Sequence, residues 1–131
     1  MSEKLLHQYE ILFVKATSDL HMASLAIKAH DKDIDEATII FHFQQAAEKL
    51  LKAVLSFQGV HFEKVHDLTV LIELCDKNEI KLPGYTQRFA ELNPFAVIGR
   101  YDFFTKAEIN LNEWEEMLRQ FRGFIGNKIN L

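Results

Sequence analysis

Apolar residues recur at three- and four-residue steps through two long segments of the chain. The first segment covers residues 3–29 and the second covers about residues 35–58, and this periodicity is typical of amphipathic helices. A polar break lies between them, where Asp33 or Asp35 could cap the second helix, and Gly59 suits the position just past its end. The apolar stripe of the first helix consists of Leu5, Tyr9, Leu12, Ala16, Leu20, Ala23 and Ile27.

Shorter helical patterns follow after residue 59. Either His66 or Asp67 could cap a third, shorter helix. Residues 82–84 (LPG) predict a turn, and residues 85–92 predict a short helix that ends before a break at Pro94. The apolar positions of the third helix are Leu68, Leu71, Ile72 and Cys75.

A final helix is predicted over residues 108–129, with Asn110 and Glu113 as a capping pair. Residues 94–104 (PFAVIGRYDFF) are interpreted as irregular or as one helical turn, because no partner strand is predicted elsewhere. These elements predict an all-α fold with a single domain over residues 1–131, an up-and-down bundle of four main helices plus one or two short helices. The inward positions of the last helix are Leu111, Trp114, Leu118, Phe121 and Ile125.

The second helix combines a broad apolar arc with a polar arc about 120° wide. Glu48 precedes Lys52 by four residues, the favourable order for an ion pair worth ~0.2–0.5 kcal/mol on an exposed helix. Gln44 falls inside the apolar arc, and we expect it to bond a backbone group, another helix or a dimer partner. Phe41 falls at the edge of the polar arc, where it suits a subunit interface. The polar arc, which is either an ordinary solvated face or part of a site, consists of His42, Gln45, Glu48, Lys49, Lys52 and Ser56.

Composition is that of one globular domain, with 48% hydrophobic and 26% charged residues in 131. The net charge of −4 means that any nucleic-acid role must depend on a local basic patch. Cys75 is the single cysteine, the N-terminus resembles no signal peptide, and no apolar run approaches the ~20 residues of a membrane span. We therefore expect a cytoplasmic protein that does not contact a membrane.

Common catalytic and cofactor motifs are missing from the sequence. The six histidines lack metal-ligand spacing, and there is no phosphate-binding loop, dinucleotide fingerprint or nucleophile elbow, so neither a metal nor a cofactor is expected. His66, at a helix start, is interpreted first as a structural cap. Arg100, Tyr101 and Asp102 lie in a connecting segment, where Arg100 could contact a phosphate or, with Asp102, tie the segment to Glu48 or Lys52.

Three sequence stretches together resemble the HEPN (higher eukaryote and prokaryote nucleotide-binding) domain family. They are QQAAEKLLKAVL at 44–55, HDLTVLIELC at 66–75 and GRYD at 99–102, in this order on a helical chain of suitable length. The resemblance implies a bundle of about four or five helices that often forms a homodimer. Many members of the family accompany minimal nucleotidyltransferases in toxin–antitoxin-like pairs, and others are metal-independent ribonucleases.

The family's ribonuclease signature places a histidine four to six residues after an arginine, and this chain departs from it. No histidine follows any of the four arginines at this distance, and no histidine at all occurs after His66. The arginines are Arg88, Arg100, Arg119 and Arg122. RNA cleavage commonly needs a group that exchanges a proton near neutral pH, for which histidine is the usual choice. No catalytic residue is therefore assigned.

Three hypotheses follow from these observations. The first is a non-catalytic, homodimeric module that binds a nucleotide, RNA or a nucleotidyltransferase partner in a toxin–antitoxin-like system. The second is a metal-independent ribonuclease whose divergent active site uses Arg100 and His66, and the third is a purely structural dimerisation protein. A basic groove favours the first two, whereas a buried, fully paired set favours the third. The candidate groove consists of Gln45, Glu48, Lys49, Lys52, His66, Arg100, Tyr101 and Asp102.

Overall fold

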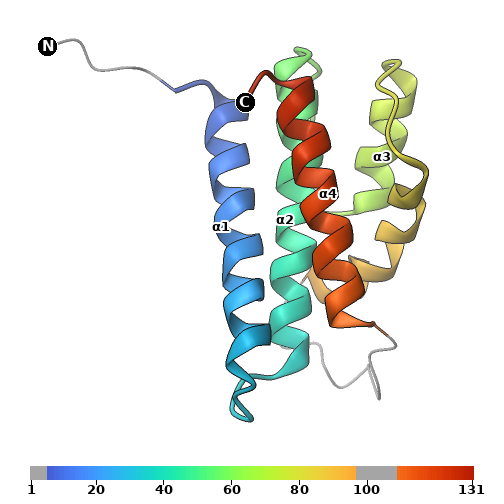
Figure 1. Cartoon of the computed structure of the whole chain (residues 1–131). Coiled ribbons are helices and arrows are strands. Elements are labelled where there is room, and N and C mark those ends of the chain that lie inside the picture. The colour runs from blue at the N-terminus through green and yellow to red at the C-terminus, as the bar shows by residue number, and fades with distance from the viewer. Residues whose placement is uncertain (1–5, 97–108) are drawn as a thin grey trace, which may run out of the picture.

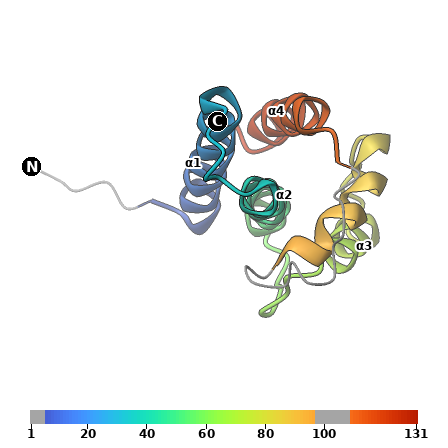
Figure 2. The ribbon, with the colours of Figure 1, turned by 90° about the horizontal axis from the view of Figure 1, so that it is seen from below.

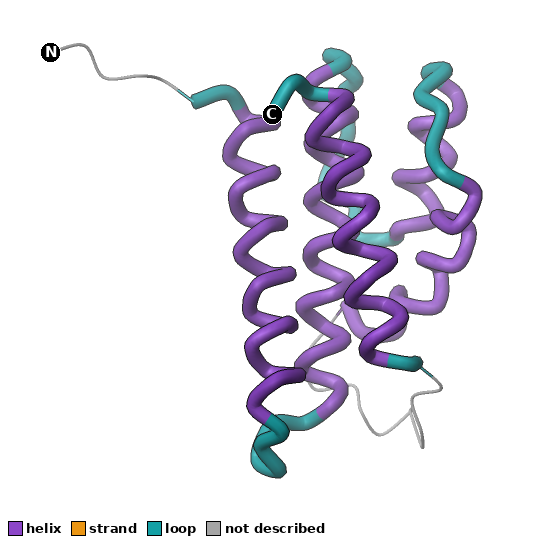
Figure 3. The backbone as a smooth tube through the Cα atoms, in the orientation of Figure 1, coloured by secondary structure: helices purple, strands orange, loops and turns teal. Residues whose placement is uncertain are grey.

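The computed structural model describes residues 6–96 and 109–131, and every regular element in these ranges is a helix. This result confirms the all-α prediction. Figures 1 and 3 show a bundle in which the helices run along a common axis. In chain order the elements are α1 (Gln8–Ala29), α2 (Glu36–Phe57), α3 (Leu68–Lys77), the 3₁₀-helix η1 (Gly84–Ala96) and α4 (Leu111–Lys128).

Helix ends coincide with the capping residues that the sequence offers. Asp35, and not Asp33, caps α2 by accepting a hydrogen bond from the backbone N–H of Ala37 at 3.2 Å. Gly59, with φ of 72°, follows the end of α2 in the left-handed conformation that glycine adopts without strain.

The third and fourth α-helices begin in the same way. The Asp67 carboxylate accepts from the backbone N–H of Thr69 at 2.9 Å, and the Asn110 side chain accepts from that of Glu113 at 3.1 Å. Local polar groups therefore determine where both helices start.

The prediction that Pro94 breaks the short helix was wrong, because η1 continues through it to Ala96. Each 3₁₀ turn is closed by its own i→i+3 bond, so the donor missing at Pro94 removes one bond without ending the run. Leu92 and Phe95, on either side of the proline, are buried and hold the segment against the core.

Helix α2 is the centre of the molecule. Figure 2 shows α1 and α4 on one side of α2, and α3 with η1 on the other. Twelve residues of α2 are buried, which is why its sequence is apolar on most of its circumference. An aromatic cluster completes the core, in which the Phe89 ring of η1 lies 5.0 Å from that of Phe121 and 6.0 Å from that of Trp114.

Helix α1 lies at the edge of the bundle. Ala16, Leu20 and Ala23 of the predicted stripe are buried, and Phe13, outside that stripe, joins them. The same helix also carries large apolar side chains that are exposed. They are Ile11, Val14, Met22 and Leu25.

Candidate functional site

The polar side chains of α2 do not form a solvated face. Because other helices surround α2, none of the six residues of the predicted polar arc is fully exposed, and Glu48 is buried. The structure divides five of these residues into two clusters, one toward α1 and one toward the segment that precedes α3, while Ser56 donates separately to Gln8 of α1 at 3.1 Å.

The first cluster joins α2 to α1 through Asp19. One carboxylate oxygen of Asp19 lies 3.1 Å from Nδ1 of His42, and the other accepts a hydrogen bond from Lys49. Lys49, a predicted groove residue, is therefore paired with a carboxylate inside the bundle. Lys49 is thus engaged between α1 and α2, with 23% of its side chain exposed.

The second cluster, here called the Glu48 cluster, consists of Gln44, Gln45, Glu48, Lys52 and His66. The Glu48 carboxylate accepts from Gln44 Nε2 at 3.1 Å and from Lys52 Nζ at 3.0 Å, and His66 Nδ1 lies 3.2 Å from it. A buried carboxylate needs such partners, because an unpaired charge in the interior is strongly destabilising. The predicted pair of Glu48 and Lys52 is thus present, but it is buried and part of a network.

The hydrogen bonds of Gln44 explain why this polar residue lies inside the apolar arc. Its Nε2 also donates to the backbone carbonyl of His66 at 3.3 Å, and its Oε1 accepts from Gln45 Nε2 at 2.7 Å. The expected bond to a backbone group is confirmed, whereas the side-chain partners Glu48 and Gln45 belong to the same helix. Gln44 was not predicted as a site residue, although its polar side chain at an apolar position was the signal for one.

His66 is not the cap of α3, since Asp67 performs that role. The His66 side chain is instead 69% exposed, with its ring held at one edge by Glu48. A carboxylate can only accept, so Nδ1 is the donating nitrogen and Nε2 is the one that Glu48 does not hold. His66 is thereby oriented by a buried group and remains accessible to a ligand.

Asn93 of η1 fixes the segment that carries His66, and sequence patterns gave no indication of this role. Its Oδ1 accepts from the backbone N–H of Leu68 at 2.9 Å, and its Nδ2 donates to Asp67 at 3.0 Å. The start of α3 is therefore attached to η1 as well as to α2, which restrains the backbone at His66.

An open hollow adjoins the Glu48 cluster through Lys52. Its volume is about 560 Å³. The Lys52 ammonium lies 5.8 Å from the centre of the Phe62 ring, in cation–π geometry. The loop residues His61 and Lys64 are exposed. The hollow thus combines cationic and aromatic groups, and its lining residues are Lys52, His61, Phe62, Glu63 and Lys64.

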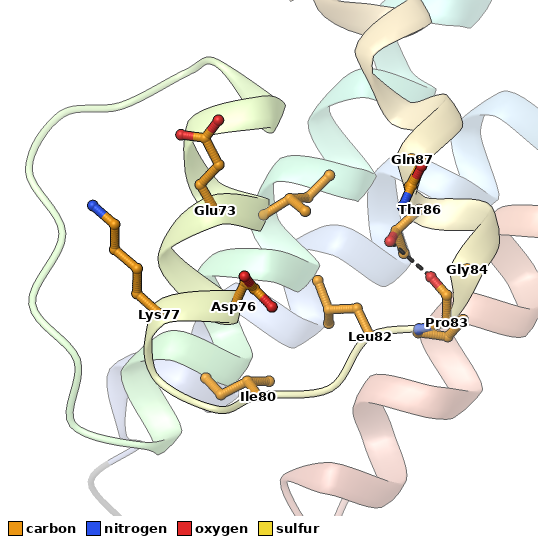
Figure 4. Close-up of a pocket in the computed structure, with 10 residues that line it drawn as sticks. Glu73, Asp76, Lys77, Ile80, Leu82, Pro83, Gly84, Thr86 and Gln87 are labelled. Carbon is orange, nitrogen blue, oxygen red and sulfur yellow. Dashed lines mark hydrogen bonds between the residues drawn. The ribbon is translucent and has the colours of Figure 1, made fainter.

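A second hollow, of about 440 Å³, lies between α3 and η1 (Figure 4). Glu73 and Asp76 give it an acidic side, and on the opposite side the Thr86 hydroxyl donates to the carbonyl of Pro83 at 2.8 Å. No predicted site residue lines it. Lys77 also lines this hollow, but the two carboxylates outnumber it, and the net negative charge makes the hollow unsuited to phosphate.

The arginines of the described residues are all engaged with neighbouring groups. Arg88 donates hydrogen bonds to Glu113 at 2.6 Å and to Glu91 at 3.2 Å, and these bonds raise the pKa of its guanidinium above the ordinary value. Arg122 donates to Thr17 at 2.7 Å, and Arg119 lies 3.8 Å from a carboxylate of its own helix. None of these three belongs to the Glu48 cluster. The predicted groove residues Arg100, Tyr101 and Asp102 lie outside the described residues.

The described residues form neither a metal-binding cluster nor a membrane-spanning helix. Within residues 6–96 and 109–131, no group of three or more His, Cys, Asp or Glu residues is arranged to hold a metal ion. Over the same ranges, every helix is too short or too polar to cross a bilayer.

Of the comparisons with known proteins, one gives a match. No match was found among curated proteins or among solved structures. A family model described as the HEPN domain matches residues 9–128, from the second residue of α1 to the last residue of α4. The match thus spans the whole helical bundle, in agreement with the sequence resemblance, and the chain belongs to the HEPN domain family.

Proposed function

We propose that the protein is a non-catalytic binding module for a nucleotide or RNA, and that the Glu48 cluster with the adjoining hollow is its phosphate-binding surface. The observation that carries this proposal is the way the buried Glu48 orients two groups. Glu48 and Lys52 are paired and mostly buried, as a structural role would require, but Glu48 also holds His66, whose side chain is 69% exposed, and Lys52 lines the hollow together with the exposed Lys64. Membership of the family supports this function.

The chemistry of the hollow suits a nucleotide or a single RNA strand. Lys64 is exposed and can approach a phosphate, whereas Lys52 is paired with Glu48 and lines the hollow beside the Phe62 ring. Phe62 offers an aromatic ring on which a base can stack, an interaction that RNA-binding proteins commonly use. Glu63 offsets part of the positive charge, which favours weak binding of a short ligand over tight binding of a long duplex.

Binding can be tested with a fluorescent single-stranded RNA of about eight nucleotides and with ATP as the nucleotide probe. Lys64→Ala should weaken RNA binding and lower the slope of log K against log salt by about 0.7, the value for one phosphate contact on a single strand. Phe62→Leu should weaken binding without changing that slope. Lys77→Ala, which alters the acidic hollow, is the matched control.

Unchanged affinity in both Lys64→Ala and Phe62→Leu would exclude this surface as the binding site. Circular dichroism of each variant should show unchanged helicity. Arg100→Ala tests the predicted contribution of that residue in the same assay.

The geometry of His66 favours a second candidate function, a metal-independent ribonuclease. A histidine held through Nδ1 by a buried carboxylate is the arrangement that orients an acid–base group. This function requires cleavage of RNA in the presence of a chelator and loss of cleavage in His66→Gln. Absence of cleavage over a broad panel of RNA substrates would exclude it.

The partner we propose is a minimal nucleotidyltransferase, acting with this protein as a toxin–antitoxin-like pair in the cytoplasm. The support is family membership and the single, buried cysteine, which fits a reducing compartment. Co-expression with the product of the neighbouring gene, followed by size-exclusion chromatography, tests the pairing. Separate elution of the two proteins would contradict it.

A further inference from the structure

Helix α1 has two apolar faces on opposite sides. One face packs into the core through Phe13, Ala16, Leu20 and Ala23. At 100° per residue, the other face lies about 180° away, and the bundle does not cover it. Figures 1 and 2 both show α2 and α4 on one side of α1, with no described element on the other.

The exposed apolar residues of α1 lie together on one face and are not scattered singly over the surface. Val14 is 61% exposed, Met22 and Leu25 are each 51% exposed, and Ile11 is 41% exposed. Four aliphatic side chains at these exposures present on the order of 300 Å² of apolar surface, comparable to the largest patch on a typical monomer. Such a patch is commonly an interaction site.

The order of residues along this face is symmetric about Ser18. Val14 and Met22 lie four residues before and after it, and Ile11 and Leu25 lie seven residues before and after it. A two-fold axis through the point beside Ser18 would therefore place each apolar residue opposite an apolar residue of a second copy. Isologous dimers require this kind of self-complementary surface.

Size and charge agree with the same arrangement. Ser18 is exposed and small, so two helices can approach closely where they cross. Glu10 and Lys28 lie on the same flank of the apolar face, near opposite ends of α1. An antiparallel pair brings Glu10 of one copy near Lys28 of the other, whereas a parallel pair would bring like charges together.

We propose that the protein forms a homodimer in which α1 packs antiparallel against α1 of a second copy, about a two-fold axis beside Ser18. Family resemblance implies only that a dimer is common, whereas the structure indicates this face and this register. The apolar face is smaller than the ~800 Å² that each partner buries in a standard interface. The exposed flanking residues Lys15, Ser18 and His21 add to the contact, and for so small an interface we expect a dissociation constant in the micromolar range.

Analytical ultracentrifugation of the full chain tests the association, with the monomer mass of 15.2 kDa as reference. Val14→Glu places a carboxylate opposite Met22 at two symmetric positions and should weaken the dimer at least about 100-fold. Met22→Lys added to Val14→Glu provides an opposite charge across the axis and should restore association to within about tenfold of the unmodified chain. Val70→Glu, at an exposed valine of α3, is the matched control and should have no effect.

A disulfide tests the register independently. Facing Cα atoms of two packed helices come within ~4–6 Å of each other, a separation that a disulfide can bridge. Ser18→Cys should therefore cross-link to itself under mild oxidation, while Gln120→Cys, on the exposed face of α4, should not. The native Cys75 is buried and should not interfere.

Several outcomes would overturn the proposal. They are a monomer at roughly 100 µM, a dimer that persists in Val14→Glu, and a Ser18→Cys variant that cross-links no faster than Gln120→Cys. Failure to rescue Val14→Glu with Met22→Lys would overturn the antiparallel register. None of these results depends on ligand binding, so they are separate from the test of the proposed function.

Discussion

Substituting Glu48 by glutamine removes one negative charge from the centre of the polar network while preserving the size of the side chain. Lys52, with only 12% of its side chain exposed, would then lose its carboxylate partner. Breaking a buried ion pair by removing one member typically costs about 3–5 kcal/mol. Lys52 lies at the rim of an open hollow and can regain some water, so we expect a loss of about 2–3 kcal/mol for Glu48→Gln.

Urea denaturation followed by circular dichroism measures this loss, and the corresponding decrease in Tm is roughly 10 °C for a domain of this size. A second substitution isolates the cause. Lys52→Met in the Glu48→Gln background removes the unpaired ammonium and should recover at least about half of the lost stability. As a control, Glu91→Gln alters the exposed pair with Arg88 and should cost no more than about 0.5 kcal/mol.

Two results would refute this reasoning. One is a loss below about 1 kcal/mol for Glu48→Gln, the value expected of an exposed pair. The other is a double variant no more stable than the single one, which would show that the unpaired ammonium is not the source of the cost.

Three further predictions concern stability. Gly123→Ala adds a methyl group that meets open space and should stabilise α4 by ~0.5–1 kcal/mol. Gly126→Ala should give clearly less stabilisation, because its methyl group would lie 3.3 Å from the Phe13 ring. The midpoints of urea denaturation of the two variants test this difference. Burial raises the pKa of Cys75 from 9.0 to about 12, so between these two pH values the thiol is mostly ionised in the unfolded chain and neutral in the folded one. Stability should fall by about 1.4 kcal/mol between pH 8 and pH 10, and Cys75→Ala, though less stable throughout, should lack this component of the slope. Asn93→Ala removes the acceptor at the start of α3 and should cost ~1–2 kcal/mol in the same denaturation assay, where a loss below about 0.3 kcal/mol would contradict the role assigned to it.

The candidate site was predictable only in part. The sequence placed Glu48 and Lys52 four residues apart and therefore indicated their pairing, since i and i+4 positions are neighbours on any helix. It also marked Gln44 as a polar residue at an apolar position. It did not indicate that Lys49 turns to Asp19, because that contact joins residues 30 positions apart.

The two faces of α1 illustrate a similar limit. Sequence periodicity identified one apolar stripe, and part of that stripe is buried. Large apolar residues also recur on the opposite side, so periodicity alone does not reveal which face the bundle covers. Only the positions of α2 and α4 distinguish the core face from the exposed one.

Local interactions explain what the sequence by itself determined. Asp35, Asp67, Asn110 and Gly59 act within a few residues of their own positions, so helix ends and the all-α class could be predicted from the printed order of residues. The tertiary structure decided which side chains are buried and which segments meet. If it were exposed, the pair of Glu48 and Lys52 would contribute only a few tenths of a kcal/mol to stability. Packing on several sides of α2 removes water from the pair, so that each charge becomes strongly destabilising without the other.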